Sequence, residues 1–441
     1  MVAVAEHLST YLASFEQAGK QRAAEPTWLA ELRRAGMQRF AQAGFPTTRH
    51  EEYKYTNLAP LAKIPFRPAG AGQLREEHLG PWRFELKGDC LVFVNGRFAA
   101  DLSRRSGKSG LEVDSLATRL SSDGASVEQH LARYTAKRDN VFAALNTAFF
   151  EDGAVIRIPD RAVIENPVQL IFVSTADEAE TVSHPRVLIV AGRDSQAAVI
   201  ENYVGLGGNV YWTNAVTEIV AGANARIEHC RLQQERTAGF HTGFVEIHQS
   251  RDSHVTTHSL SLGGSLVRND VEVVLDDEAA ESTLTGLYAV RDRQHVDNRT
   301  CIDHAKPHGT SHQLYKGVLD GHSTGVFNGK IIVRPDAQKT DAIQSNKNLL
   351  LSEYANINTK PQLEIDANDV KCTHGATVGQ IDEEAVFYLR SRGIAYAQAR
   401  ALLTYAFAAD ILERVSIVPV RDYVEAKLMN WLAGDGREVA R

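Results

Sequence analysis

The feature that most constrains the fold is a series of short β-rich runs between about residues 154 and 375. The runs have roughly four to six residues and are separated by Gly, Asp, Asn and Ser, the residue types that favour turns. The first three strand–turn–strand units start roughly 25–30 residues apart, a repeat length compatible with stacked coils. No helix-patterned run of about ten or more residues interrupts this block, which argues against a doubly wound α/β fold.

Three of these units show the same order of strand, polar turn and strand. Their first strands are expected at residues 217–220, 245–247 and 271–274, and their turns at 221–224, 250–253 and 276–279. A β-sandwich would show similar strands, but the repeated order favours a parallel β-helix, in which each coil covers the apolar edge of its neighbour. The expected fold class is therefore mainly β.

Helical patterns are expected on both sides of this core. Leu8, Leu12 and Phe15 recur at helical spacing, and residues 44–55 then read as a polar, aromatic linker. Near the other end, Asp382 is an expected N-cap for the first of three helices. The predicted regions are an N-terminal helical region (1–75), a mixed α/β connecting region (76–153), the β-helix core (154–375) and a C-terminal helical domain (376–441).

Composition excludes several classes of partner. The 48 Lys and Arg against 55 Asp and Glu give a net charge of −7 without any block of like charge, so neither nucleic acid nor an anionic membrane surface is indicated. Arg400 and Asp410 interrupt the most apolar long segment, which therefore cannot span a bilayer. The four scattered cysteines fit reduced thiols, and the first residues show no secretory signal, so a cytoplasmic location is expected.

Cys372 and His374 lie where the strands give way to the last helices. In an extended chain, residues i and i+2 point to the same face, so a thiol and an imidazole could stand side by side. Such a pair suits a soft or borderline metal. Taken alone, the pair is explained more simply by a small buried thiol beside a hydrogen-bonded histidine.

A second candidate metal site comprises Cys301, His304, His308 and His312, with His295 nearby. On a helix the three later histidines would line one face, but the prolines and glycines between them disfavour a helix. In an extended or looped segment the spacing loses its meaning. A stand-alone metal-binding β-helix enzyme using these residues stays open as an alternative.

Motifs for catalysis are missing or incomplete. Residues 325–331 are one residue short of a phosphate-binding loop and lack its hydroxyl, so the chain is not expected to be an ATPase. The acidic runs 276–278 and 382–384 are explained by a turn and a helix start, and no nucleophile motif is present. An enzyme acting on polysaccharide, a second alternative for a β-helix, would need a secretion signal and a catalytic cluster.

A dense series of motifs resembles the SufB/SufD family of iron–sulfur cluster assembly proteins. It covers about residues 300–395 and comprises residues 313–321, 325–330, 334–342, 346–352, 359–365, 371–379 and 387–394. Residues 44–58 are similar to the SufD branch of the family, and so are residues 374–377, where the SufB branch typically has glutamate after the histidine.

This resemblance implies a right-handed parallel β-helix flanked by helical domains, and a non-catalytic scaffold subunit of the SUF assembly complex. It implies pairing with a SufB-like paralogue through the C-terminal end of the β-helix, and docking of a SufC-like ATPase on about residues 382–432. The residues expected to contribute to that docking are Asp382, Glu384, Phe387, Leu389, Arg390, Leu403, Phe407 and Ile411.

The resemblance also implies that His374, with Cys372, contributes to an iron or nascent cluster site shared with the paralogue. Iron–sulfur clusters usually take four ligands, mostly cysteine, so no stably bound cofactor is expected on the isolated chain. Cys230 and Cys301 stay open as further ligands, and so does the choice among iron entry, sulfur transfer and structural support. A homodimer of the isolated chain is also possible, through the same end of the β-helix.

Overall fold

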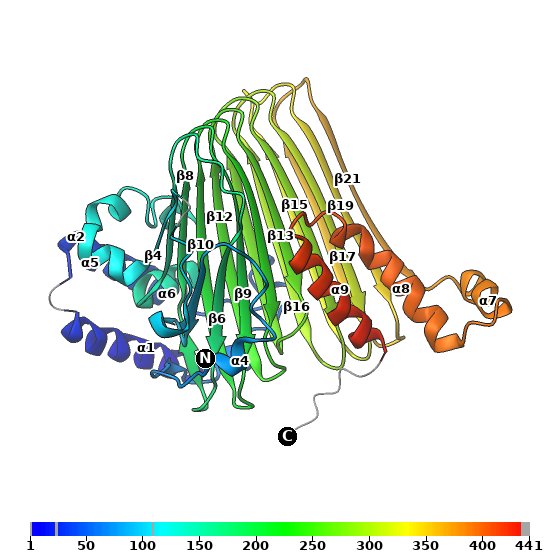
Figure 1. Cartoon of the computed structure of the whole chain (residues 1–441), viewed down its shortest axis with the longest axis horizontal. Coiled ribbons are helices and arrows are strands. Elements are labelled where there is room, and N and C mark those ends of the chain that lie inside the picture. The colour runs from blue at the N-terminus through cyan, green and yellow to red at the C-terminus, as the bar shows by residue number, and fades with distance from the viewer. Residues whose placement is uncertain (1, 23–24, 108–109, 434–441) are drawn as a thin grey trace.

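Two long sheets of parallel strands form the body of the protein, and the chain passes from one to the other in about eight turns of a β-solenoid (Figure 1). The structure is a computed structural model that describes residues 2–22, 25–107 and 110–433. The fold class predicted from the sequence, mainly β with a parallel β-helix core between helical ends, is confirmed. None of its helices, within the described residues, is long and apolar enough to cross a membrane.

Sheet A is built mainly from even-numbered strands and sheet B mainly from odd-numbered strands. Sheet A contains β4 (Glu112–Ser115), β5 (Gly153–Ile158), β8 (Arg186–Ala191), β10 (Tyr211–Ala221), β12 (Gly239–Gln249), β14 (Leu266–Leu275), β16 (His295–His304), β18 (Thr324–Val333) and β20 (Asn356–Ile365), with β1 (Arg67–Pro68) and β7 (Thr181–Ser183) at its side. Sheet B contains β2 (Cys90–Val94), β3 (Arg97–Phe98), β6 (Val168–Ser174), β9 (Gln196–Gly205), β11 (Arg226–Gln234), β13 (His254–Ser261), β15 (Glu281–Val290), β17 (Thr310–Leu319), β19 (Asp341–Leu350) and β21 (Lys371–Gln380).

The register of the strands explains the repeat seen in the sequence. Tyr211 pairs with Gly239 and His295 pairs with Thr324, so successive coils are offset by 28 and 29 residues. The strands are longer than the predicted runs, and β10 has 11 residues. The difference arises because the interior of the coils accepts polar side chains such as Thr213 and Thr217, which interrupt the apolar pattern.

The polar turns between the two sheets form a ladder of their own. Six residues at the same place in successive coils have φ between 54° and 63°: Asp194, Asn224, Asp252, Ala279, His308 and Lys339. Asn and Asp tolerate this left-handed conformation better than most residues. Each backbone N–H donates to the next coil, as from Asn224 to the carbonyl of Arg251 at 2.8 Å. The turn residues predicted from the sequence therefore lie where each coil is hydrogen-bonded to the next.

One glycine of the incomplete phosphate-loop motif has a packing role. A Cβ at Gly329 of β18 would lie 2.1 Å from Nε2 of Gln344, which reaches across the interior from β19. Gly329 thus leaves room for a buried side chain of the opposite sheet.

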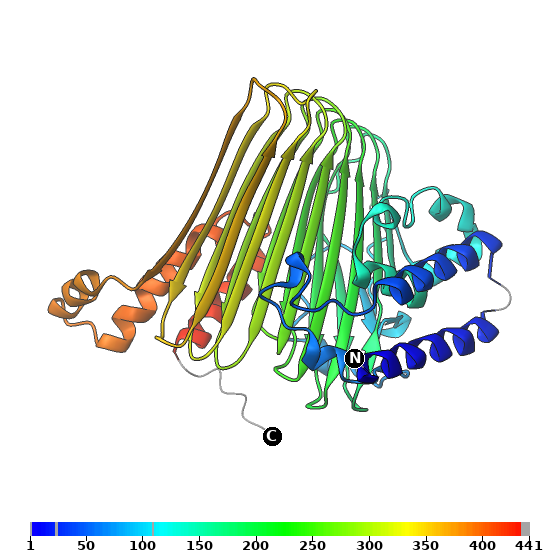
Figure 2. The same ribbon diagram turned by 180° about the vertical axis from the view of Figure 1, so that it is seen from behind.

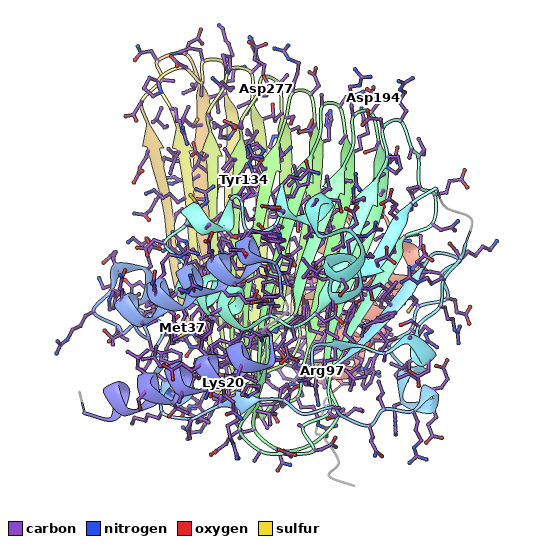
Figure 3. All side chains as sticks on the ribbon, turned by 90° about the vertical axis from the view of Figure 1, so that its left-hand side faces the viewer. Lys20, Met37, Arg97, Tyr134, Asp194 and Asp277 are labelled. Atoms are coloured by element: carbon purple, nitrogen blue, oxygen red, sulfur yellow. The ribbon has the colours of Figure 1, made fainter. Side chains whose placement is uncertain are left out.

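Helices cover the outer faces of both sheets. Next to sheet A lie α1 (Val2–Gln21), α2 (Thr27–Ala43) and α6 (Val141–Phe149). Their aromatic side chains belong to the same buried cluster as Trp212 of β10, and Phe142 of α6 contacts the Trp212 ring. The short helices α3 (Ala59–Ala62) and α4 (Glu76–Leu79) and the helix α5 (Leu116–Glu128) belong to the same half of the chain. Seen from this end, α1 and α2 lie in front of the first coils, at the labels of Lys20 and Met37 (Figure 3).

The C-terminal helices lie at the other end of the stack. They are α7 (Glu383–Ser391), α8 (Tyr396–Leu412) and α9 (Val418–Leu432). Side chains of α8 and α9 pack on the outer face of sheet B, whereas α7 projects beyond the last coils (Figure 1). The strand β21 continues past the predicted boundary at residue 375, since residues up to Gln380 still pair with β19.

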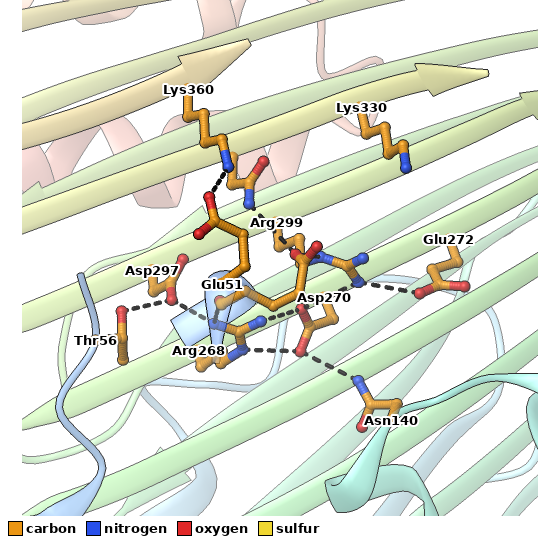
Figure 4. Close-up of polar contacts among 12 residues, drawn as sticks. Glu51, Thr56, Asn140, Arg268, Asp270, Glu272, Asp297, Arg299, Lys330 and Lys360 are labelled. Atoms are coloured by element: carbon orange, nitrogen blue, oxygen red, sulfur yellow. Dashed lines mark hydrogen bonds and ion pairs between the residues drawn. The ribbon is translucent and has the colours of Figure 1, made fainter. Parts of the chain in front are cut away.

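The segment 44–58, of which residues 44–55 were predicted as a linker, is a strap fixed across sheet A (Figure 2). It contains a short 3-10 helix, Glu51–Tyr53. The Tyr53 ring lies 3.9 Å from the guanidinium carbon of Arg268, and Glu52 pairs with Arg299 at 2.5 Å. Glu51 pairs with Lys360 on the last strand of the sheet, β20 (Figure 4). The strap therefore ties the N-terminal region to strands up to the opposite end of the core.

Arg268 is the buried anchor of this strap. Its guanidinium pairs with Asp270 at 2.9 Å and with Asp297 at 2.5 Å, and it donates to the carbonyl oxygen of Glu52 at 3.0 Å (Figure 4). Thr56 donates to the same Asp297 carboxylate at 2.6 Å. Two carboxylates thus hold one buried cation, which in turn holds the strap.

We expect Arg268→Met to lower the free energy of unfolding by about 3–5 kcal/mol, because it removes the paired cation of the buried Asp297 and the nearer of the two cations beside the buried Asp270. Urea denaturation followed by circular dichroism measures the change. Arg251→Met removes an exposed ion pair with Glu278 and is expected to change it by less than about 1 kcal/mol. Equal effects of the two substitutions would contradict the anchoring role.

Candidate functional site

Cys372 and His374 lie on β21, the last described strand of sheet B, which is labelled in Figure 1. Among the described strands, β21 pairs only with β19, and β20 pairs only with β18, so this end of the coil stack is open. Parallel β-helices normally cap such ends, because an uncovered edge presents unpaired backbone groups. The predicted site therefore lies where the last described strands have one edge without a partner strand. We call this surface the open end (β20 and β21).

The pairing register directs both side chains toward the interior of the coil. Cys372 pairs with Ala342 and His374 pairs with Gln344, and both partners on β19 are buried. Cys372 is half-buried against an apolar cluster that includes Ile331. His374 is exposed, because no further described coil covers it.

Cys372 and His374 form only part of the ligand set that a metal ion would need. Burial, and then the charge of Asp341, raise the pKa of the Cys372 thiol, so a neighbouring metal ion would be needed to favour the thiolate. His374 can offer a ring nitrogen directly from the surface. In the part of the chain that the structure describes, no group of three or more His, Cys, Asp or Glu side chains could hold a metal ion.

The predicted start of the first C-terminal helix is confirmed. Oδ1 of Asp382 accepts from the backbone N–H groups of Glu384 at 2.9 Å and Ala385 at 3.4 Å. The helix ends before Gly393, whose φ is 88°. The capped helix α7 therefore holds its side chains in fixed directions outside the core.

The predicted docking residues differ in exposure. Phe387 is 72% exposed, and its neighbour Tyr388 is 56% exposed. Asp382, Glu384 and Arg390 are also exposed, whereas Leu389, Leu403 and Phe407 are half-buried in the packing of α7 and α8. Ile411 is fully buried between α8 and sheet B. Its side chain packs α8 on the sheet, and the prediction that it contributes to the docking surface is wrong.

Lys316 of β17 fixes α8 on sheet B, a role that the sequence reasoning missed. Its Nζ donates to the carbonyl oxygen of Phe407 at 2.9 Å and pairs with Asp410 at 2.8 Å. The hydrogen bond from Lys316 lowers the pKa of the Asp410 carboxyl group. The only signal in the sequence was a lysine inside the family-like segment 313–321.

The second candidate metal site is not assembled. Cys301 and His304 lie on β16 with opposite side-chain directions, His308 lies in a turn and His312 lies on β17 of the other sheet. His304 Nε2 lies 2.8 Å from Oγ of Ser311, inside the coil. Burial raises the pKa of Cys301 to about 12. The solenoid separates these residues because each passage through a turn changes the sheet.

Cys230 is also excluded from the open end. It is fully buried on the face of sheet B that α8 and α9 cover, and burial raises the pKa of its thiol. It therefore behaves as a small apolar side chain.

Comparisons with known proteins agree with this architecture. The family model described as the SufBD core domain of SUF-system FeS cluster assembly matches residues 172–407, and the model of the SufBD N-terminal region matches residues 5–170. The chain belongs to the SufBD family of the SUF iron–sulfur cluster assembly system.

Similar proteins come from several groups of organisms. An iron–sulfur cluster assembly SufBD family protein of Synechocystis sp. is 34% identical, over 90% of this chain and 90% of the relative. The iron–sulfur cluster assembly protein SufD of Escherichia coli is 32% identical, over 91% and 92%. The chloroplastic protein ABCI7 of Arabidopsis thaliana is 29% identical, over 89% and 84%. The resemblance to the SufD branch, predicted from the sequence, is confirmed by these matches.

The burial of the four cysteines predicts an order of reaction with iodoacetamide. In the full chain we expect Cys372 to be alkylated first and Cys301 more slowly, because both are partly accessible. Cys90 and Cys230 are buried and should react only after unfolding. Mass spectrometry of timed samples measures the order. Alkylation of Cys230 in the native protein as fast as Cys372 would contradict the burial described above.

Proposed function

We propose that this chain is a non-catalytic scaffold subunit of the cytoplasmic SUF complex. It pairs with a SufB-like paralogue through the open end and docks a SufC-like ATPase on its C-terminal helices. Its part in cluster assembly is to complete, with the paralogue, a site for iron or a nascent cluster. The observation that carries the proposal is a thiol–imidazole pair on an unfinished β-helix end, in a chain of the SufBD family.

The open end has the properties of a surface that another chain covers. Both edge strands have one side without a described partner strand, and apolar side chains of the coil interior are left partly uncovered there. Ile365 of β20 is 40% exposed and Val378 of β21 is 50% exposed, although their partners Val333 and Asn348 are buried. A paralogue with the same fold could continue the stack, and a second copy of this chain could occupy the surface in its absence.

The ligand set supports a shared site. Cys372 and His374 supply at most two ligands, whereas an iron–sulfur cluster usually takes four, mostly thiolates. A partner that contributes the remaining thiolates would bury the pair and favour the Cys372 thiolate by charge. The iron or cluster is the cargo of this site, held transiently within the complex.

The projecting helix α7 supports the docking of an ATPase. Phe387 and Tyr388 are exposed beside the charged Asp382, Glu384 and Arg390, an apolar centre with a polar rim. Lys316 holds α8 on sheet B, so a movement of the docked partner could be transmitted to the coils next to the open end.

We expect His374→Ala to reduce cluster formation by the reconstituted complex at least tenfold. The substitution should not change the binding of the subunits to one another. The measurement is the appearance of cluster absorbance, with a pull-down of the paralogue and the ATPase as a check on pairing. Thr373→Ala is the matched control, since Thr373 is exposed on the same strand with the opposite side-chain direction. Cluster formation by His374→Ala at the wild-type rate would refute the assignment of this residue.

We expect Phe387→Asp to weaken binding of the SufC-like ATPase at least tenfold, because it places a charge at the centre of an apolar contact. Titration calorimetry with the full chain measures the dissociation constant. Leu12→Asp is the control, because Leu12 is 39% exposed on α1, next to sheet A at the other end of the stack. An unchanged dissociation constant for Phe387→Asp, or an equal loss for Leu12→Asp, counts against docking on α7.

A further inference from the structure

A ladder of buried polar side chains leads through the coil interior to His374. On sheet B, Gln313 of β17 pairs with Gln344 of β19, and Gln344 pairs with His374 of β21. All three positions face the interior of the coil, and Gln344 is only 1% exposed. His374 is therefore the last member of this row, at the open end.

The inner members of the row fix the orientation of the Gln344 amide. Oγ1 of Thr300 donates to Oε1 of Gln313 at 3.1 Å, and Nε2 of Gln344 donates to the same oxygen at 2.9 Å. The absence of a Cβ at Gly329 leaves room for this Nε2 group. Because the amide nitrogen is held by Gln313, the carbonyl oxygen is the free end of the Gln344 side chain.

That carbonyl oxygen is buried and has no hydrogen-bond partner among the described residues. A buried acceptor without a donor lowers the stability of the folded protein, so most buried polar atoms in native proteins have a hydrogen-bond partner. Neighbouring strands lie about 4.7–4.9 Å apart, and the next side chain of the row on the open side is His374. An inward turn of the exposed imidazole brings a ring N–H to this acceptor.

We propose that Gln344 is the positioning residue of the site: its Oε1 accepts the inward N–H of His374. A carbonyl can only accept, so the ring nitrogen that faces Gln344 must carry the hydrogen. The other nitrogen then bears its lone pair and is directed out of the open end, toward iron or a cluster. Metal-ligating histidines are commonly fixed in this way through their second nitrogen.

The role of Gln344 in preparing His374 for iron or a cluster rests on the proposed function, but the test of this role does not use cluster assembly. The full chain is labelled with ¹⁵N-histidine, and the ring nitrogens are observed by NMR at mildly alkaline pH, where imidazole is neutral. His374→Ala identifies the signals of this residue among the 16 histidines. A single tautomer gives two widely separated nitrogen shifts, whereas a solvated ring gives averaged shifts.

We expect one tautomer for His374 in the wild type and averaged shifts in Gln344→Met, which removes the acceptor at similar volume. The control is Thr359→Val, because Thr359 Oγ1 on the inward face of β20 is also buried without a hydrogen-bond partner among the described residues. Thr359→Val should keep the single tautomer. Gln344→Leu replaces Gln344→Met if the latter does not fold.

Averaged shifts in the wild type overturn the proposal whatever the variants do, and so does a single tautomer that survives in Gln344→Met. A tautomer that responds to Thr359→Val and not to Gln344→Met also overturns it. If the tautomer depends on Gln344 but His374→Ala still assembles clusters normally, the positioning stands and the proposed function fails. The reverse pair of results leaves the function and removes the role of Gln344.

Discussion

The pairing of each coil with the next is the interaction on which the rest of the structure depends. Every strand of the solenoid obtains its backbone hydrogen bonds and its apolar contacts from the coils before and after it. At the N-terminal end this requirement is met by other strands of the chain. Antiparallel β4 ends sheet A, and antiparallel β3 ends sheet B. At the other end nothing in the described chain continues β20 and β21, and that is where Cys372 and His374 lie.

The long-range ties of the N-terminal region reach toward this open end without covering it. The strap 44–58 crosses sheet A and contacts Lys360 of β20 through Glu51, while Arg268 holds its centre. On sheet B, Lys316 holds α8 against β17. The last coils are therefore braced on both outer faces, although no described strand covers their end face. Under the proposed function, this bracing holds the open end in place before a paralogue binds and so lowers the ordering cost of association.

Parts of this picture followed from local patterns. The turns at 221–224, 250–253 and 276–279 were correct because Gly, Asn and Asp mark left-handed or tight turns wherever they occur. The cap at Asp382 was correct because capping depends on neighbouring residues alone. The strand lengths were underestimated, because polar residues such as Thr217 and His229 face the interior and break the alternation expected of an apolar core. The linker was misjudged, because its partners Arg268 and Lys360 lie far away in the sequence.

The sequence was enough to predict the repeated coil, the helical ends and the family, because each depends on short-range spacing or on dense motifs. It also placed a thiol and an imidazole on one face of one strand, because extended chains alternate. The tertiary structure was needed to show that β21 is the last described strand of its sheet, that Cys301 and the histidines near it point to different places, and that Ile411 is buried. It alone set Gln344 beside His374, because strand register is fixed by packing between segments about thirty residues apart.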